Sequence, residues 1–593
     1  MSEKRTKRAI LWGAGLLAAA GLALLFWRAQ RGPETEPGAR PIPPAASAEP
    51  AGAEPLPEDT DEITPLLVKR SMEKLQGQAR TDEALAQELE QGGYTLEAPF
   101  VQLDPYHIAP LSAMALFQTD EETRITVRIP GDTPNAEVRY TLQEYGTSHR
   151  VPICGLYPDR ENRVEITAET RSGESRTAVA AVETEPLTED LQRIVLRAKT
   201  FDAGAYQPGL NFSFSSLDEK PYRFAFDCDG AIRWYLTDEM DTFNVGSGAA
   251  YQTGSRGIFL PRGNPAQGTV LFEETDLLGR VLNVYYSPYG SHHDTVLTGR
   301  GTLLVNGSND AHGGGAVNDF VYEIDLATGG ITHTLDYKQV LERTRIFGLR
   351  YSDSDWMHLN TAVYCGDDIV ASSNFQSLVL CTDWAGNIKW MLGDPTGYLE
   401  QYRAYLLTPL GADFEWPYNQ HAAQILPDLD GDPGTVDLLL FDNGMSRFAA
   451  DKELQGQIAN GARVQPDSYS RMVHYRVNPA DMTVEQIWQY GKEHPELYAD
   501  KRGDANLLPN GNILGLFSIA TNSTSCAHAV YQEVDRAGNT VWQCLGQSLA
   551  ASNFYCEYKT ERLEPLAEND GEPELGREPG VYIPEAILKQ CGY

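Results

Sequence analysis

Positive charge is scarce in this chain. Its 593 residues include 48 Lys and Arg against 83 Asp and Glu, which gives a formal net charge of −35 at pH 7. Proteins that bind nucleic acids or anionic lipid surfaces do so through clusters of basic residues. The composition therefore excludes nucleic acid and anionic lipid as expected partners.

Metal-binding cysteine motifs are also missing. The eight cysteines are scattered, with no CxxC pair and no Cys/His spacing typical of a zinc site. Several lie in apolar, strand-like stretches, where a buried thiol is the simplest interpretation. Disulfides can form outside the cytoplasm, but their pairing cannot be deduced from the sequence. No metal and no cofactor is expected.

The N-terminus lacks a cleavage signal. A basic segment, 1–9, precedes the uncharged run 10–27, whose eighteen residues just reach the length that spans a bilayer. The basic flank would keep the N-terminus in the cytoplasm. No small-x-small site follows the run, where FWRAQ stands, so an uncleaved signal anchor is favoured over a cleaved signal peptide. Either one places the remainder outside the cytoplasmic membrane, at the cell surface or in the periplasm.

Four regions follow the predicted anchor. Residues 28–61 are rich in Pro, Ala and Glu and predict an extended linker. Residues 62–93 are rich in helix formers and predict one or two helices. Residues 94–186 contain short alternating strands with turns about every ten residues, the pattern of a small β-sandwich. The remainder, 187–593, is repetitive, and the predicted fold class is all-β.

Six repeated segments organise the region 187–593. Each consists of a strand, a turn and a second strand: YRFAFDCDGAIRWYL, VLFEETDLLGRVLNVYY, FVYEIDLATGGITHTLDY, LVLCTDWAGNIKWML, VHYRVNPADMTVEQIWQY and AVYQEVDRAGNTVWQCL. Their turns fall near 230, 279, 329, 386, 482 and 538, and further strands lie between them. A four-stranded repeat of about 40 to 50 residues is typical of a propeller blade. The count predicts a six-bladed β-propeller.

Three histidines occupy similar places in successive repeats. His292 and His358 each precede an apolar strand by 12 residues, and His421 stands directly before the strand-like run that follows it. Since the first strand of each blade lines the propeller axis, residues just before it crowd round one mouth of the channel. We therefore expect the three histidines to converge, although 66 and 63 residues separate them.

Residues 94–550 resemble the bacterial arylsulfate sulfotransferases. The stretches that carry the resemblance are PYHIAPLSAMALF, VPICGLYPDRENRVEIT, DWMHLNTAVY, YNQHAAQIL with LLLFDNG, and SRMVHYRVNPADMTVEQIWQYGKE. The resemblance implies an enzyme that moves a sulfuryl group from a phenolic sulfate ester to another phenol, without a nucleotide donor. Its partners would be small phenols and aryl sulfates. A homodimer is left open.

The same motifs imply roles for individual residues. His421 would be the residue that becomes sulfated, because neutral imidazole is a capable nucleophile near pH 7. His358 and Asn360 would hold the sulfuryl oxygens. His292 would be a further catalytic histidine, preferred over His293 because of its spacing, with His293 kept as a substrate contact. Aromatic residues in the same loops could form a phenol-binding mouth: Trp356, Phe375, Phe414, Trp416 and Tyr418.

One position departs from the family pattern. Asn374 stands where the family usually has an arginine, and a neutral amide replaces a permanent charge that can bind sulfate in a bidentate manner. Asn374 is expected to contact the substrate as a neutral donor. Either another cation substitutes, for which Arg345, Arg350 and Arg447 are the candidates, or the activity is weaker or differently directed.

Two other hypotheses stay open. A propeller of this kind could bind a ligand without catalysis, or its axial histidines could hold iron or zinc. The acidic run DLDGD, 428–432, hints at calcium but lacks the distal glutamate of an EF-hand loop, so a solvated turn is the favoured interpretation.

Overall fold

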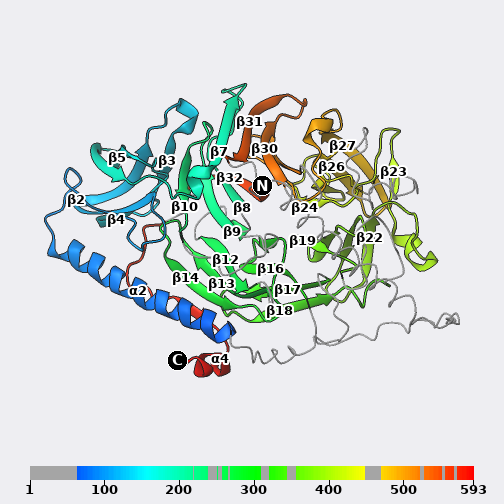
Figure 1. The fold of residues 1–593 in the computed structure, drawn as a ribbon, viewed down its shortest axis with the longest axis horizontal. Helices are drawn as coiled ribbons and strands as arrows, with labels where there is room; N and C mark the ends of the chain where they lie inside the picture. The colour runs from blue at the N-terminus through cyan, green and yellow to red at the C-terminus, as the bar shows by residue number, and fades with distance from the viewer. Residues whose placement is uncertain are drawn as a thin grey trace, which may run out of the picture. The chain divides into compact units, whose positions relative to one another are not determined.

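The computed structural model describes residues 63–217, 220–237, 250–251, 257–264, 268–308, 319–342, 355–445, 447, 469–520, 526–549, 555–566 and 571–593. This part of the chain is mostly β-strand with few helices, which confirms the all-β class (Figure 1). The predicted anchor, 10–27, and linker, 28–61, lie outside the described residues. No helix within the described ranges is long and apolar enough to cross a bilayer.

A single long helix occupies the region predicted to be helical. Helix α2, Ile63–Gln91, buries Leu67 and Leu75 against β13 and β14, and Leu85 against the first sheet (Figure 1). Its two halves therefore tie the first sheet to a later one. The other helical elements in the described ranges are α4, Glu585–Gln590, and the 3₁₀ turns η1, Pro134–Ala136, η2, Leu191–Arg193, η4, Glu400–Tyr405, and η5, Pro495–Leu497.

The first sheet is built round one long strand. Its strands are β1, Phe100–Leu103, β2, Ser112–Ile129, β3, Val138–Thr141, β4, Gly146–Cys154, β5, Arg160–Thr170, and β6, Ser175–Thr184. The first half of β2 pairs with β1 and β4, whereas its second half pairs with β3 and β5. Buried apolar side chains from both halves enter one core, which continues into the later sheets through residues such as Phe224 and Trp234.

Six further sheets of four or five strands follow in the described residues. The first three contain β8, Leu210–Leu217, β9, Lys220–Phe226, and β10, Ile232–Tyr235; then β11, Ala250–Tyr251, β12, Ile258–Asn264, β13, Gly268–Thr275, and β14, Val281–Tyr286; then β15, Thr295–Leu297, β16, Thr302–Gly307, β17, Phe320–Asp325, and β18, Ile331–Asp336. The next two contain β19, Leu359–Cys365, β20, Asp368–Ser373, β21, Leu378–Thr382, and β22, Ile388–Leu392; then β23, Thr408–Leu410, β24, His421–Ile425, β25, Val436–Asp442, β26, Arg471–Asn478, and β27, Thr483–Tyr490. The last contains β28, Asp504–Leu507, β29, Ile513–Ala520, β30, Cys526–Val534, and β31, Thr540–Ser548.

Strands from the two ends of this region complete sheets formed elsewhere. β7, Ile194–Thr200, pairs with β31, and β32, Tyr555–Leu563, pairs with β8. The short strand β33, Gly580–Tyr582, adds to β14. The sheet of β8–β10 and the sheet of β28–β31 are thereby each completed by a strand from the opposite end of this region.

Neighbouring sheets share apolar cores. Residues that pack across the boundaries, in chain order, include Trp234 with Ile258, Tyr285 with Tyr322, Leu335 with Ile369, Trp390 with Leu440, Phe441 with Phe517, and Tyr531 with Phe226. Consecutive innermost strands also lie in contact: β11 with β15, β15 with β19, β19 with β24, β24 with β28, and β28 with β32. The starts of these strands are thus brought near one another.

Each of the six repeated segments forms a hairpin of a different sheet, and its turn has a common design. An Asp or Asn at the start of the turn accepts hydrogen bonds from backbone N–H groups two to four residues later: Asp227, Asp276, Asp325, Asp383, Asn478 and Asp535. Five turns then place a glycine in the left-handed region, and the sixth places Met482 there, at φ 53°. An L side chain tolerates that conformation poorly, so the glycines are required by the turn itself.

These turn glycines differ in what surrounds them, and this gives a test of the packing. Gly279 and Gly538 both have a φ of 87°, but a Cβ on Gly279 would lie 2.3 Å from Ile108, whereas a Cβ on Gly538 would meet nothing. We predict that Gly538→Ala destabilises by about 1–2 kcal/mol through backbone strain. Gly279→Ala should cost roughly 1–3 kcal/mol more, because it also pushes the hairpin off the first sheet. Thermal unfolding of both variants measures this, and equal losses would refute the clash.

Candidate active site

Four histidines lie together at the starts of the innermost strands. His292 and His293 precede β15, His358 precedes β19, and His421 is the first residue of β24. The ring of His293 lies 4.5 Å from that of His358 and 6.5 Å from that of His421, measured between centroids. Residues that are far apart in the chain are brought to one site, as the repeat predicted.

The backbone enters this site in an unusual conformation. His293, His358, Asn419 and Ala422 have φ values of 57°, 48°, 56° and 53°, all in the left-handed region. Such conformations cost energy in non-glycine residues and tend to gather where function requires a side chain to be held in place. The pairing register of β24 also shifts just after His421, so the strand bulges there.

One asparagine fixes the tautomer of His421. The amide nitrogen of Asn443 donates to the carbonyls of Ala499 and Arg502, at 2.8 and 2.6 Å. Its Oδ1 can therefore only accept, and it lies 2.6 Å from Nδ1 of His421. Nδ1 of the neutral ring must then carry the proton, and the lone pair stands on Nε2. His421 is buried, which orients this nitrogen firmly.

His292 and His293 form a hydrogen-bonded pair. Nε2 of His292 donates to the carbonyl of Gly307 at 3.0 Å, so Nδ1 accepts from Nδ1 of His293 at 2.9 Å. Burial lowers the pKa of His292 to about 4. Burial, together with the charges of the neighbouring histidines and Arg502, holds the pKa of His293 well below its usual range. Both rings are therefore neutral near pH 7, and His293 keeps its lone pair on Nε2.

The ring positions give His293 the central place. His293 contacts His358 and lies within 6.5 Å of His421, whereas His292 lies behind it and orients it. The spacing argument favoured His292 because it counts residues to the next strand. A count of residues carries no information on the left-handed backbone at His293. The ring of His293 lies beside His358 and near His421.

His358 has an acidic partner, Asp355, which the sequence analysis did not identify. Asp355 accepts a hydrogen bond from Nδ1 of His358 at 2.5 Å, and the Phe375 ring stacks on the imidazole at 4.3 Å with an interplanar angle of 9°. The carboxylate and the stacked ring fix the orientation of the imidazole. An Asp three residues before a loop histidine gives no distinctive signal in a single sequence.

The two predicted asparagines contact the backbone beside His421. Nδ2 of Asn360 donates to the carbonyl of Gln420 at 2.6 Å, and Nδ2 of Asn374 donates to the carbonyl of Asn419 at 2.7 Å. Both are buried, so in this structure their amides hold the segment that precedes the nucleophile candidate. Their predicted contacts with a substrate stay predictions.

Among the candidates for a compensating cation, Arg447 is already neutralised. It donates to the buried carboxylate of Asp442 at 2.7 Å, and Arg345 and Arg350 lie outside the described residues. Arg502 is a different cation, and its charge acts on His293 and on Tyr558. Tyr558 is buried, with its ring 6.0 Å from His293 and 6.3 Å from His421. Neither residue stands in a motif that sequence patterning could single out.

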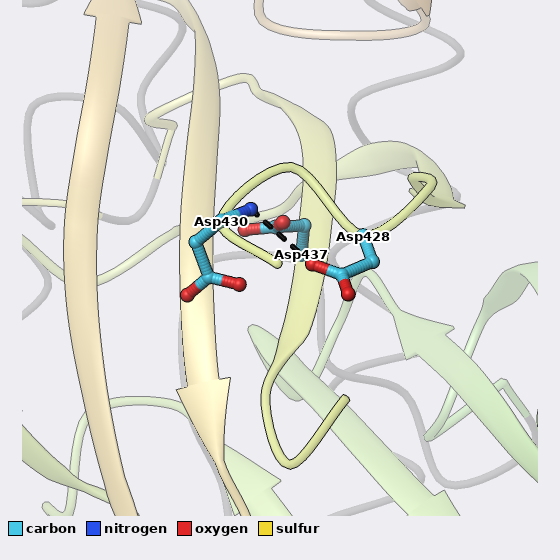
Figure 2. A group of neighbouring side chains, drawn as sticks. All are labelled: Asp428, Asp430 and Asp437. Carbon is cyan, nitrogen blue, oxygen red and sulfur yellow. Dashed lines mark hydrogen bonds between the residues drawn. The ribbon is translucent and has the colours of Figure 1, made fainter. Parts of the chain in front are cut away.

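The acidic turn before β25 was interpreted as solvated. Figure 2 shows Asp428, Asp430 and Asp437 grouped round this turn, the only set of three possible metal ligands that converge in the described part of the chain. Arg476 pairs with Asp430 at 3.1 Å and with Asp437 at 2.9 Å, and Asp428 accepts hydrogen bonds from the turn backbone. These contacts satisfy the carboxylates without an ion.

Fold and site together define an all-β protein in which adjoining sheets present buried histidines from the starts of their innermost strands. The arylsulfotransferase (ASST) family profile matches residues 196–554, and the arylsulfotransferase Ig-like domain profile matches residues 100–185. The chain belongs to the arylsulfotransferase family. This membership supports an aryl sulfotransferase function.

Two curated proteins illustrate the relationship. The arylsulfate sulfotransferase AssT of Lelliottia amnigena is 24% identical over 503 residues, covering 66% of this chain and 80% of that protein. The protein of the same name from Escherichia coli O6:H1 is 25% identical over 504 residues, with the same coverage of 66% and 80%.

Similar solved structures are more distant. A member of the DUF4221 family from Bacteroides vulgatus is 9% identical, covers 62% of this chain and 97% of its own, and has a TM-score of 0.27. Apo AztD from Citrobacter koseri is 10% identical, covers 46% of this chain and 95% of its own, and has a TM-score of 0.20. Scores this low carry no argument about the present fold.

The depressed pKa of His292 predicts acid sensitivity. The unfolded chain binds this proton with a pKa near 6.5 and the folded chain with one of about 4, so the unfolded state holds more protons between these values. Stability is therefore lost as the pH falls from about 6.5 toward 4, by about 2 kcal/mol at pH 5 from His292 alone. His292→Gln should shrink the difference in unfolding free energy between pH 7 and pH 5 by about that amount. An unchanged difference would contradict the assignment.

Proposed function

We propose that this protein is an aryl-sulfate sulfotransferase that works by a ping-pong mechanism through an N-sulfated His421. One observation carries the proposal: Asn443 holds the proton of His421 on Nδ1 and so places the lone pair on Nε2. Family membership supplies the class of chemistry. The activity of the relatives named arylsulfate sulfotransferase agrees with phenols and aryl sulfates as substrates.

The first half-reaction forms a nitrogen–sulfur bond. Nε2 of His421 attacks the sulfur of the donor in line with the leaving oxygen, and the bond from sulfur to the aryl oxygen breaks. The departing phenolate takes a proton from an imidazolium, a role that this proposal gives to His358, because Asp355 orients its ring and His293 lies beside it. The products are a phenol and the N-sulfated enzyme.

The second half-reaction reverses these roles. An acceptor phenol approaches the sulfated ring, and its proton passes to the lone pair on Nε2 of His293 as the oxygen attacks sulfur. The nitrogen–sulfur bond breaks, and neutral His421 is restored. The proton gained by His293 then passes to His358, whose ring lies 4.5 Å away, so that every ring returns to its starting state. His292 acts through His293, since it holds the other nitrogen of that ring.

Arg502 takes the place of the missing family arginine in this proposal. Its carbonyl accepts from the same Asn443 that orients His421, and its charge reaches His293 and Tyr558. A guanidinium here would stabilise the charge that spreads over the sulfuryl oxygens in the transition state. Asn374 is then free of that task, and it serves the backbone at Asn419.

Two finer features of the architecture are also proposed. The six sheets close into a six-bladed β-propeller, a view supported by the exchanged strands β7 and β32 and by the apolar core between each pair of neighbouring sheets. Residues 10–27 anchor the chain in the cytoplasmic membrane, with the catalytic region outside it.

The covalent intermediate is directly testable. A chromogenic aryl sulfate given without acceptor should leave the protein one sulfuryl group heavier, with the added mass on the peptide that contains His421. Digestion must be done at neutral or alkaline pH, because the nitrogen–sulfur bond is acid-labile. His421→Asn should lose both the label and the turnover.

The outcomes separate the competing mechanisms. Robust turnover by His421→Asn would leave direct transfer between two bound phenols, or another histidine, as the explanation. Wild-type protein that binds aryl sulfates but releases no phenol would favour a non-enzymatic binding protein. Turnover that depends on a metal, measured after chelation, would favour a histidine-ligated metal site.

Removing the charge of Arg502 should slow the transfer. Arg502→Gln is expected to lower kcat/KM for aryl sulfates by about 10²–10³-fold, mostly in kcat, because the charge acts on the transition state. Arg502→Lys should recover part of the loss. Lys501→Gln, which makes the same change in net charge one residue away, is the matched control and should have little effect. Equal rates for Arg502→Gln and wild type would rule out this cation.

Membrane attachment is tested with the whole chain. The full-length protein should fractionate with membranes, and deletion of residues 1–31 should release it, because the apolar run 10–27 would be removed. Recovery of a soluble mature form that begins beyond Trp27 would replace the anchor with a cleaved signal peptide.

A further inference from the structure

A large cavity lies away from the histidines. It has a volume of about 1100 Å³ and is lined by the middle and far ends of the same innermost strands, including Val296, Ile425 and Leu507. The histidines stand at the starts of β15, β19 and β24, whereas the cavity lies along β15, β24, β28 and β32 toward their carboxyl ends. The proposed sulfuryl transfer leaves this space unused.

A buried charged layer separates the two regions. Asp294, Asp504, Lys559 and Glu561 line the cavity, and Asp294 and Lys559 directly follow His293 and Tyr558 in the chain. The ammonium of Lys559 donates to Asp294 at 3.0 Å and to Glu561 at 2.7 Å. Two carboxylates thus pair with one lysine, Asp504 is a third carboxylate in the same layer, and the layer holds an excess of negative charge.

The carboxylates respond to this excess. Burial raises the pKa of Glu561 to about 7, against the pull of Lys559, and burial also raises the pKa of Asp504. Burial opposes the charge of Lys559, but its acidic neighbours hold its pKa well above the ordinary value. A further cation placed in the cavity would relieve the same repulsion.

Polar atoms in the cavity wall also lack partners. Thr295 is almost fully buried, and its Oγ1 has no hydrogen-bond partner among the described residues; the same is true of Nδ1 of His474. Both residues line the cavity. The ammonium head of a ligand brings three N–H donors, and buried acceptors without a partner are costly. The walls beyond are apolar, which suits an alkyl or aryl tail.

The cationic residues of the wall are mostly neutralised. Arg476 is paired with Asp430 and Asp437, and Arg562 is paired with Glu533. Arg536 lies over the Trp488 ring at 5.6 Å, and burial lowers the pKa of its guanidinium. An organic anion would therefore find little positive charge on this wall beyond Arg536. A cation would find the carboxylates of Asp294, Asp504 and Glu561 in the charged layer.

We propose that this cavity is a second ligand site, separate from the histidines, which takes an organic ammonium ion with an apolar tail. The ammonium head lies against Asp504 and Glu561, and the tail lies along Val296, Ile425 and Leu507. The site does not depend on the sulfuryl chemistry, since it shares no side chain with the histidine cluster.

The probe is hexylammonium, compared with hexanoate and hexanol by titration calorimetry on the full-length protein at pH 8. One hexylammonium should bind per chain, and the two analogues should bind at least about tenfold more weakly, because they lack the charge-assisted hydrogen bonds. Glu561→Gln and Asp504→Asn should each weaken hexylammonium about ten- to hundredfold. Arg536→Gln, a charge removal of the opposite sign on the same wall, should not weaken it.

The controls keep the two sites distinguishable. His421→Asn should bind hexylammonium as the wild type does, although aryl sulfate turnover is lost. Loss of binding in this variant would place the ion at the histidines and overturn the proposal. Tighter binding of hexanoate than of hexylammonium would overturn it too, as would the absence of saturable binding by any of the three probes. Thermal unfolding checks that each variant is folded. If Glu561→Gln does not fold, Asp504→Asn provides the test of the charged layer.

Discussion

The hydrogen bond between Asn443 and His421 is the contact on which the rest of the site depends. It is informative because the amide of Asn443 is committed to two backbone carbonyls, so its oxygen has only one role left. The proton of His421 is thereby fixed on the nitrogen that faces the protein. A histidine without such a partner would exchange tautomers and offer its lone pair in two directions. The carbonyl of Arg502 accepts from the same amide, so one side chain holds both the ring of His421 and the backbone at Arg502.

Desolvation explains how several imidazoles can share so small a space. Protonated rings 4.5 to 6.5 Å apart would repel strongly. Burial lowers the pKa values of His292 and His293, so both rings stay neutral near pH 7. Each neutral ring then donates through one nitrogen and keeps a lone pair on the other, as its hydrogen-bond partners require. His358 has a different partner, because the carboxylate of Asp355 accepts from its Nδ1. Burial and hydrogen-bond partners thus give rings of one residue type different surroundings within one site.

The sequence predicted the features that local chemistry determines. Two strand-like runs joined by a short turn rich in Asp, Asn and Gly form a hairpin in each of the six repeats, so all six could be located, and His421 and His358 could be placed at strand starts. What could not be predicted depends on contacts between distant segments. Asn443 and Arg502 meet His421 only because β25 and the loop before β28 lie beside β24. The count of residues that favoured His292 failed to see that the backbone turns at His293. Asn360 and Asn374 looked like substrate donors because their motif implied it, and only the structure shows the carbonyls to which they donate.

The acidity of the chain as a whole has a consequence for the proposed chemistry. In the proposed reaction an anionic aryl sulfate must approach a protein with a net charge of −35. Neutral imidazoles do not offset that repulsion, but they respond to it, since an anion placed beside a desolvated ring raises the pKa of that ring. Donor binding would therefore make His293 a stronger base than it is in the empty site. The proposed second half-reaction asks this ring to take the proton of the acceptor phenol. On this argument the charge of the bound sulfuryl group prepares the base for that step.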